Sequence, residues 1–302
     1  MLEQKVISFH DIVNDDSEPP PPIIDDGVLL DRSLLLIVGQ PKANKSFLAL
    51  NMGVAIASGT DFAGFTVVDK HRVLFLSAEG GYYSNRERIK TITADIDEAD
   101  LHEIFFSTKV VPDLGNDADD TIFKECIEKY KPKVLILDPF IRFHTADENS
   151  SSSMSNIFAK ISKLIEEHDI AVILVHHEGK KPSNNSKGGR GSSVIHAEYD
   201  SCIKIRKQKN ANHKIEFDMR HVETPEHKEL VFNTDTFWFE DPYKSSPIVE
   251  YISQNGLSYK KDMVSYLKTT LPCSSAKAYR IIDTAVSEEI IVQDGKKYKL
   301  SS

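Results

Sequence analysis

Residues 34–50 constrain the fold of this chain more than any other segment. They read Leu-Leu-Leu-Ile-Val-Gly-Gln-Pro-Lys-Ala-Asn-Lys-Ser-Phe-Leu-Ala-Leu, an apolar run that breaks into a loop and enters a helix. A phosphate-binding P-loop has glycine, four residues, glycine, lysine and then serine or threonine. Gly39, Lys45 and Ser46 match that pattern, while Asn44 replaces the second glycine. The segment predicts a nucleotide-binding loop; the alternative is an ordinary strand, turn and helix with a chance Lys-Ser pair.

The substitution at position 44 is compatible with phosphate binding. The usual glycine supplies a backbone conformation with positive φ, and asparagine tolerates that conformation best among the other residues. The loop N–H groups and the helix N-terminus can then surround a triphosphate. Lys45 is expected to reach the β- and γ-phosphates, and Ser46 to ligate Mg2+. The residues expected to bind ATP are Gly39, Pro41, Lys42, Ala43, Asn44, Lys45, Ser46, Phe47 and Arg88.

Length and composition favour a soluble globular protein. The 302 residues exceed one average domain, which favours one large domain with a small appended one. Hydrophobic residues make up 40% of the chain and charged residues 27%. No apolar run approaches the roughly 20 residues of a membrane span, and the N-terminus has no signal-peptide pattern. With three widely spaced cysteines, we expect a reducing, cytoplasmic location and no membrane contact.

The net charge of −9 argues against a nucleic-acid binder that works by bulk electrostatics. The charge is unevenly distributed, because residues 245–302 contain eight Lys or Arg and six Asp or Glu. Any contact with nucleic acid must therefore come from local patches.

The chain up to residue 242 has two parts. Residues 1–29 are acidic and contain four consecutive prolines, so we expect an extended arm outside the sheet. Strand and helix patterns alternate over residues 30–242, which predicts an α/β domain with a mostly parallel central sheet and an antiparallel extension at its end. The expected strands are 34–38, 73–77, 104–107, 134–137, 172–175, 201–206, 214–220 and 229–232, of which the last three are expected to be antiparallel. The expected helices are 45–58, 84–98, 119–130 and 154–168.

Residues 247–302 form a separate module after a linker. Helix patterns cover 247–255, 260–269 and 274–289, and a hairpin with the turn Asp294-Gly295 follows. Three helices followed by a hairpin is the order of a winged helix-turn-helix. The alternative is a protein-interaction module, because the positive charge is modest. The side chains expected to contact a nucleic-acid groove are Lys277, Arg280, Lys296 and Lys297.

Two later strands end in carboxylates. Glu79 follows a strand that we expect to neighbour the P-loop strand, where a carboxylate can polarise water for attack on the γ-phosphate. The alternative is that Glu79 only opens a surface loop. Arg86 and Arg88 can pair with phosphate or with Glu79, or lie on an exposed helix face. Asp138 follows four apolar residues, which indicates a buried strand that delivers its carboxylate to the Mg2+ shell.

Two adjacent histidines, His176 and His177, lie at the tip of another apolar run. One of them can contact the γ-phosphate and report its loss to the loop that follows. A metal site is the alternative, but no Cys, His or carboxylate spacing nearby completes one. The loop over 180–193 is basic and poor in apolar residues, which suits contact with a phosphate backbone or a solvated surface loop. Its expected nucleic-acid contacts are Lys180, Lys181, Lys187 and Arg190.

Together these motifs resemble the RecA-like ATPase core, and specifically the RepA-type replicative helicases of plasmids and phages. The resemblance covers about residues 30–240, and its most specific parts are Gly-Gln-Pro-Lys-Ala-Asn-Lys-Ser, Leu-Ser-Ala-Glu-Gly, Leu-Asp-Pro-Phe-Ile-Arg-Phe-His and Val-His-His-Glu-Gly-Lys leading to Arg-Gly-Ser-Ser. That family forms hexameric rings that hydrolyse ATP between subunits and move along single-stranded DNA. The resemblance implies ATP and Mg2+ at Lys45 and Ser46, water activation by Glu79, metal support by Asp138, γ-phosphate sensing by His177 or His176, and a basic loop near the central channel.

One residue expected from that resemblance has no match. In plasmid helicases an arginine that bridges subunits follows the Arg-Gly-Ser-Ser segment, and the aligned position here is Asp200. An arginine supplied in trans can contribute several orders of magnitude in rate. Arg206 and Arg220 are the substitutes on the strands that follow. Arg220 is preferred because its neighbourhood resembles the bridging strand of DnaB-type helicases.

Three functions fit these motifs. The first is a hexameric ATPase that unwinds or translocates on single-stranded DNA during replication of a plasmid, phage or other mobile element. The second is a recombinase-like or regulatory ATPase that binds DNA without unwinding it. The third is a non-catalytic nucleotide-binding regulator whose Asn44 loop holds ATP as a structural ligand, although the intact Glu79 and Asp138 argue against it.

Overall fold

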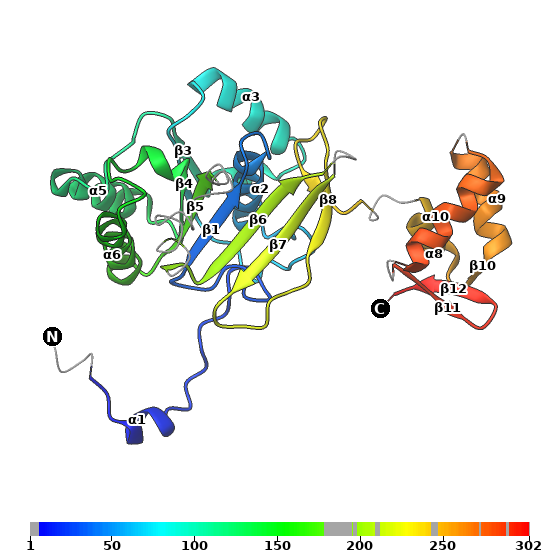
Figure 1. The fold of residues 1–302 in the computed structure, drawn as a ribbon, viewed down its shortest axis with the longest axis horizontal. Coiled ribbons are helices and arrows are strands. Elements are labelled where there is room, and N and C mark those ends of the chain that lie inside the picture. The colour runs from blue at the N-terminus through cyan, green and yellow to red at the C-terminus, as the bar shows by residue number, and fades with distance from the viewer. Residues whose placement is uncertain are drawn as a thin grey trace, which may run out of the picture.

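The computed structural model describes residues 6–177, 195, 198–208, 212–242, 247–271, 273–287 and 290–301. Its largest feature is a nine-stranded sheet in the order β3-β2-β4-β5-β1-β6-β7-β8-β9 (Figure 1). Six neighbouring strands are parallel: β3 (Ile104–Ser107), β2 (Val73–Ser77), β4 (Val134–Asp138), β5 (Ala171–His177), β1 (Leu34–Gly39) and β6 (Ser201–Lys207). The antiparallel strands are β7 (His213–Met219), β8 (Lys228–Phe232) and β9 (Phe239–Glu240). The predicted α/β fold with a mostly parallel sheet is confirmed.

The strand order corrects two expectations. The strand that precedes Glu79, β2, is not a neighbour of the P-loop strand, because β4 and β5 lie between β2 and β1. The antiparallel extension begins one strand later than expected, since β6 pairs in parallel with β1 and only β7 reverses direction.

Helices cover both faces of the sheet. They are α2 (Lys45–Ser58), α3 (Tyr82–Ile92), α4 (Glu98–Leu101), α5 (Asp120–Tyr130) and α6 (Ser151–His168). Alternate residues of β1 enter two different cores: Leu35 and Ile37 pack in the core that contains α2, and Leu34 and Leu36 in the core of α5 and α6. Because both faces are buried, the central strands read as continuous apolar runs. Within the described residues, no helix has the length and apolar character needed to cross a membrane.

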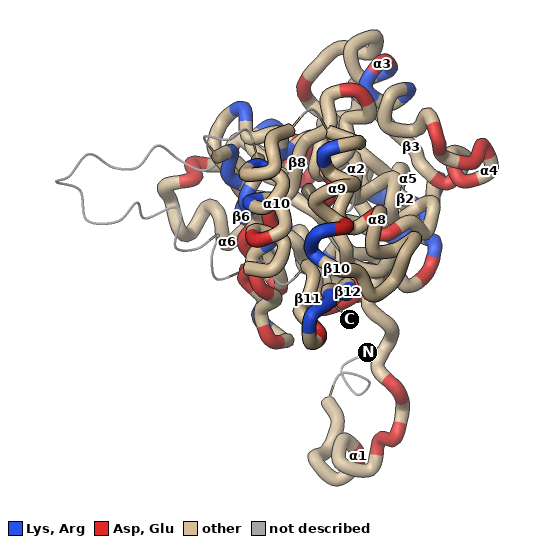
Figure 2. The backbone as a smooth tube through the Cα atoms, turned by 90° about the vertical axis from the view of Figure 1, so that its right-hand side faces the viewer, with Lys and Arg blue, Asp and Glu red and all other residues tan. Residues whose placement is uncertain are grey.

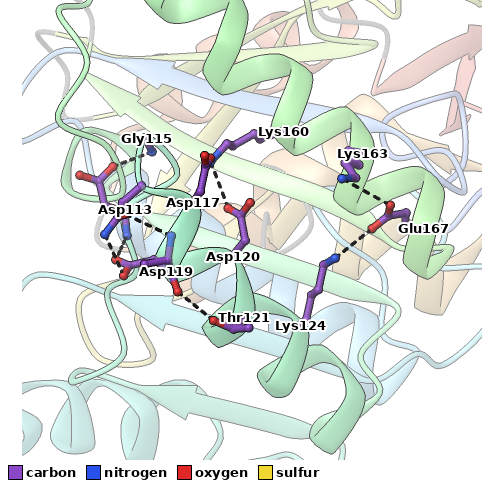
Figure 3. Close-up of polar contacts among 12 residues, drawn as sticks. Asp113, Gly115, Asp117, Asp119, Asp120, Thr121, Lys124, Lys160, Lys163 and Glu167 are labelled. Atoms are coloured by element: carbon purple, nitrogen blue, oxygen red, sulfur yellow. Dashed lines mark hydrogen bonds and ion pairs between the residues drawn. The ribbon is translucent and has the colours of Figure 1, made fainter.

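Ion pairs join α6 to α5 and to the short η1 turn (Asp117–Asp119) before it (Figure 3). The Lys160 ammonium lies 2.7 Å from Asp117 and 3.2 Å from Asp120, and Lys124 lies 3.5 Å from Glu167. Exposed pairs of this kind contribute at most about 1 kcal/mol each. The packing of these helices therefore depends mainly on their buried apolar side chains.

The N-terminal arm ends earlier than predicted. Ile23 and Ile24 are buried in the main core, and Ile24 bridges to Leu29 and Val67. The core domain therefore starts at about Ile23, which directly follows the prolines, rather than at residue 30. The expected helix 84–98 is also divided, because α3 ends at Ile92 and α4 starts only after Asp97.

The C-terminal module has its own core. Its helices are α8 (Pro247–Asn255), α9 (Lys260–Thr270) and α10 (Ser275–Ser287), and its sheet has the order β10-β12-β11, with β10 (Ser258–Tyr259), β11 (Ile291–Asp294) and β12 (Lys297–Leu300). The strand β10 was not predicted. The two loop residues of the hairpin are Gly295 and Lys296, one position later than expected, because Asp294 pairs with Lys297.

Candidate functional site

The predicted P-loop connects β1 to α2 at the carboxyl edge of the parallel strands. Asn44 has φ 61° and ψ 29°, the left-handed conformation expected at this position. Lys42 also has a positive φ of 67°. A Cβ on Gly39 would lie 2.5 Å from the carbonyl oxygen of Ile205. Glycine is therefore required where β1 ends against β6, and asparagine takes the position of the second glycine in the same backbone conformation.

The side chain of Lys45 is folded into the loop. Its Nζ donates to the carbonyl oxygens of Gly39 at 2.9 Å and Gln40 at 3.0 Å, and the residue is only 4% exposed. A buried ammonium interacts strongly with a nearby anion because the surrounding dielectric is low. Together with the open N-terminus of α2, this arrangement suits phosphate.

A pocket of about 350 Å³ lies beside this loop. It collects side chains from the β1–α2 loop, the β2–α3 segment, and the ends of β4 and β5. The predicted site residues that line it are Lys42, Asn44, Lys45, Ser46, Phe47, Glu79, Arg88, Asp138 and His177. Gly39, Pro41 and Ala43 belong to the same loop but do not line the pocket. The apolar part of the wall is formed by Leu50, Phe75, Phe106 and Val175.

Asp138 ends β4 inside the pocket and is 6% exposed. Burial raises the pKa of this carboxyl to about 6. The Ser46 hydroxyl lowers its pKa by hydrogen bonding, the Glu79 carboxylate raises it and the Lys45 ammonium lowers it. A carboxylate and a hydroxyl are the oxygen donors that Mg2+ takes in proteins. Ser46 and Asp138 therefore fit the predicted magnesium site.

Glu79 follows β2, and its backbone is fixed by a neighbour that the sequence did not reveal. The Asn85 side chain, whose residue is 3% exposed, donates to the carbonyl oxygens of Glu79 at 3.2 Å and Gly80 at 2.8 Å. The Glu79 carboxylate is 55% exposed and lies 3.8 Å from the Arg142 guanidinium. The main chain is thus held in place while the carboxylate stays open to water, as a general base requires.

The two arginines of α3 differ in position. The Arg88 guanidinium lies 5.2 Å from the centre of the Phe47 ring and donates to the Asn85 side chain at 3.5 Å. Arg86 instead pairs with Glu87 at 2.7 Å and lies over Tyr83. Arg88 therefore faces the pocket, whereas Arg86 belongs to the exposed face of the helix.

Only one of the two histidines reaches the pocket. His177 lines it and pairs in register with Gly39. Burial, together with the Lys45 ammonium, lowers the pKa of His177, which keeps this imidazole neutral at neutral pH. His176 faces the other side of β5, where Nδ1 lies 3.6 Å from the Glu148 carboxylate. The expectation that either could contact the γ-phosphate is therefore corrected to His177, because adjacent residues of a strand point to opposite faces. Among the residues that the structure describes, no group of three or more His, Cys, Asp or Glu is arranged to hold a metal.

Neither candidate trans arginine lines the pocket. Arg206 lies at the P-loop edge of the sheet, with its guanidinium 3.5 Å from Glu216. Arg220 follows β7 at the opposite edge, where its backbone N–H donates to the Asp200 carbonyl. The Asp200 carboxylate accepts a hydrogen bond of 2.8 Å from the Leu34 N–H. The position aligned with the missing arginine therefore anchors the start of β1 instead.

The predicted nucleic-acid contacts lie in two regions. Lys180, Lys181, Lys187 and Arg190 fall outside the described residues. On the C-terminal module, Lys277 and Arg280 are exposed on α10 and Lys296 is exposed in the hairpin turn. The Lys297 ammonium lies 4.9 Å from the centre of the Tyr259 ring. Figure 2 shows basic residues along β12.

A family model described as an AAA domain matches residues 3–183, more than half of the chain. The chain belongs to this family. It is accordingly a P-loop ATPase, and the matched span includes Lys45, Glu79, Asp138 and His177. The match ends before β6, so the antiparallel strands and the C-terminal module lie beyond it.

Proposed function

We propose that this AAA-domain ATPase is a DNA-linked motor, a ring oligomer that hydrolyses ATP while it unwinds or moves along single-stranded DNA in the replication of a mobile element. The main support for the proposal is the set of side chains that surround one pocket. Lys45, Ser46, Glu79, Asp138 and His177 lie around it, and in the sequence His177 leads directly into the basic segment 178–190. A phosphate sensor next to a basic segment can link the state of the nucleotide to a grip on DNA.

Each pocket residue has a role that its surroundings support. Lys45 binds the phosphates, because its buried ammonium is already directed into the loop. Ser46 and Asp138 hold Mg2+, which supplies charge neutralisation on the β- and γ-phosphates when bound. Glu79 accepts a proton from the attacking water. His177, kept neutral by burial and by Lys45, contacts the γ-phosphate.

Assembly into a ring is supported by what the pocket of one chain contains. Within the described part of the chain, Arg88 lines the pocket, but its guanidinium lies over Phe47 and donates to Asn85. Arg206 lies at the same edge of the sheet outside the pocket, and Arg220 lies at the opposite edge. A phosphoryl-transfer site gains several orders of magnitude in rate from an arginine at the developing charge. In the proposed ring, Arg220 of one subunit serves the pocket of the next.

The C-terminal module is proposed to be a winged helix that contacts DNA. Its order of elements, α8-β10-α9-α10-β11-β12, places one strand between the first two helices and a hairpin after the third. Lys277 and Arg280 on α10 and Lys296 on the hairpin are exposed. Exposed basic side chains of this kind suit phosphate contacts, which supports the proposal.

Two alternatives remain in different classes. A recombinase-like or regulatory ATPase would bind DNA through the C-terminal module without displacing a strand. A non-catalytic regulator would hold ATP in the loop containing Asn44 and turn none over. The fixed backbone around Glu79 favours hydrolysis over the last alternative.

The decisive experiment measures ATP hydrolysis with and without single-stranded DNA, together with the mass of the particle in a non-hydrolysable ATP analogue. The expected result is a nucleotide-dependent oligomer whose hydrolysis is stimulated by DNA, together with displacement of a duplex strand. Glu79→Gln should lower hydrolysis at least about 100-fold and leave nucleotide binding intact. Stimulated hydrolysis without strand displacement would favour the recombinase-like alternative. If the wild-type chain hydrolyses no ATP, the non-catalytic regulator is the correct interpretation.

A further inference from the structure

The small sheet of the C-terminal module packs on its helices through one face only. In Figure 1 its strands β11 and β12 lie along one side of the three helices. Ile291 and Tyr298 are buried and belong to the core that these helices form. Because side chains alternate along a strand, Lys297 and Lys299 lie on the opposite, outer face. Tyr259 of β10 pairs in register with Lys297 and therefore shares the outer face with it.

The ring of Tyr259 is flanked by two lysines that come from different elements. The residue is 42% exposed. The Lys297 ammonium, from β12, lies 4.9 Å from the centre of the ring, and the Lys261 ammonium, from the first turn of α9, lies 5.7 Å from it. A single exposed ring is common on protein surfaces, but two cations beside the same ring form a surface that is both positive and aromatic. We call Tyr259, Lys261 and Lys297 the Tyr259 platform.

The positive charge of the Tyr259 platform is not used in the ion pairs of the module. Among the described residues of the module, those pairs are Lys260–Asp283 and Lys299–Asp294. Lys261 and Lys297 belong to neither of them. Two positive charges held near one ring repel each other, so an anion that lies beside both is favoured. The Tyr259 platform therefore suits a ligand that combines negative charge with a flat ring.

We propose that the Tyr259 platform binds single-stranded nucleic acid, with one base stacked on Tyr259 and the flanking phosphates at Lys261 and Lys297. Proteins that bind single strands combine cations that follow the backbone with aromatic side chains on which bases stack. Rings on an open sheet face serve this purpose in known single-strand binders. In a duplex the bases stack on one another, so their faces are not available to Tyr259. The inference rests on the proposed function, to which it adds the form of the strand that the module recognises.

An acidic peptide is the other ligand that two lysines can attract. Its carboxylates would contact Lys261 and Lys297 but would bring no flat ring to cover the tyrosine. The exposed ring between the two lysines therefore favours nucleotide bases over acidic side chains. Poly-glutamate serves as the competitor that separates these two ligands in the experiment.

The test is photocross-linking of the full chain, without ATP, to oligonucleotides of about 20 nucleotides that contain 5-iodouracil. On irradiation this base bonds to an aromatic ring stacked on it, and mass spectrometry locates the modified residue. We expect a cross-link at Tyr259 with the single strand and at least about tenfold less with the duplex of the same sequence. Lys261→Ala and Lys297→Ala should each lower the yield at least about threefold, because each removes a phosphate contact. Lys268→Ala, in the last turn of α9, is the matched control and should change it less than about twofold.

Fluorescence anisotropy with the same single strand provides an independent measurement. Tyr259→Ala should weaken binding at least about fivefold, while Tyr259→Phe, which keeps the ring, should stay within about twofold of the wild type. Tyr279→Ala is the matched control. The Tyr279 ring is 45% exposed and lies 5.7 Å from the Lys260 ammonium, but that lysine is paired with Asp283. This control should also stay within about twofold of the wild type.

The proposal is overturned if cross-links form only at residues other than Tyr259, if the duplex cross-links as well as the single strand, or if Tyr259→Ala binds like the wild type. It is also overturned if poly-glutamate, at equal concentration of charge, displaces the single strand as well as oligo-dT does. Oligo-dT and oligo-U compare DNA with RNA: a cross-link at Tyr259 with oligo-U alone would support the platform and contradict a motor on DNA. A cross-link at Tyr259 without DNA-stimulated hydrolysis would likewise support the platform and refute the motor, whereas stimulated hydrolysis without this cross-link would do the reverse.

Discussion

Replacing Asp138 by asparagine should stabilise the folded chain at neutral pH while it removes hydrolysis. The folded protein holds this carboxyl in a nearly dry position that disfavours its ionised form. Asparagine has nearly the same shape and does not ionise. The variant should therefore lose the Mg2+ ligand and unfold less readily. Such a result would show that the charged carboxylate is kept for Mg2+ binding although it lowers the stability of the folded chain.

The magnitude follows from the pKa of Asp138, which is raised from 3.8 to about 6. Each pKa unit corresponds to about 1.4 kcal/mol, so ionisation in the folded state is disfavoured by about 3 kcal/mol. Because the folded pKa is raised, the folded chain binds more protons than the unfolded chain between pH 4 and 6. Stability contributed by this group is therefore present at low pH and is lost as the pH rises through 6.

The assay is urea unfolding of the wild type and of Asp138→Asn, without nucleotide, at pH 4.5 and pH 7.5. The fluorescence of Trp238, the single tryptophan, reports on the main core, where its indole N–H donates to the Ile92 carbonyl. The gain in unfolding free energy of the variant over the wild type should be larger at pH 7.5 than at pH 4.5 by about 2 kcal/mol, because part of the penalty is already present at pH 4.5. Asp95→Asn, on an exposed turn, is the matched control and should show no such difference. An equal effect at both pH values would refute the assignment of a raised pKa to Asp138.

Three further substitutions test the loop, the general-base segment and the surface. Asn44→Gly removes the strain of a left-handed backbone conformation at a non-glycine residue. It should change the unfolding free energy by no more than about 1 kcal/mol and should raise the rate of ATP hydrolysis or leave it unchanged. Loss of nucleotide binding in a filter assay would mean that the loop is built differently. Asn85→Ala leaves carbonyl oxygens of the segment at Glu79 without their donor, so it should destabilise the chain by about 1–3 kcal/mol in thermal unfolding and lower the hydrolysis rate more than ATP affinity. Equal losses in rate and affinity would contradict a role in holding Glu79. Lys160→Ala, which removes two exposed ion pairs with Asp117 and Asp120, should change the unfolding free energy by less than about 1 kcal/mol; a larger loss would show that these pairs position α6.

Local patterns predicted most elements of the main domain. The strands β2 and β3 occupy the expected residues because each is a short apolar or aromatic run, and α2 covers its expected range from the P-loop to Gly59. The division of the expected helix 84–98 was missed, because residues 93–97 carry no glycine or proline that would mark a break.

Strand order was not accessible from local patterns. Nothing within 73–77 shows that β2 lies away from β1, since that position depends on β4 and β5 entering between them. The direction of β6 was misread for a similar reason: β7 follows it as a hairpin partner, and its parallel pairing with β1 joins residues far apart in sequence.

At the site, the sequence predicted the residues that motifs mark and missed those that act through the fold. Lys45, Ser46 and Asp138 stand out by spacing, and the structure places all three around one pocket. The choice between His176 and His177 needed the pleat of β5. Asn85 could not be found, because one polar residue in a mostly exposed helix gives no sign that it is buried against the backbone of another segment.

The position of β1 in the middle of the sheet has a consequence for how the protein is made. One of its neighbours, β5, ends at His177, and the other, β6, ends at Lys207. During synthesis, both edges of β1 can therefore be paired only after about 170 further residues have been added to the chain. A chain cut at residue 183 would expose the backbone edge of β1 to other molecules, and such apolar edges promote aggregation. The segment that defines the family is thus completed by strands that lie beyond it.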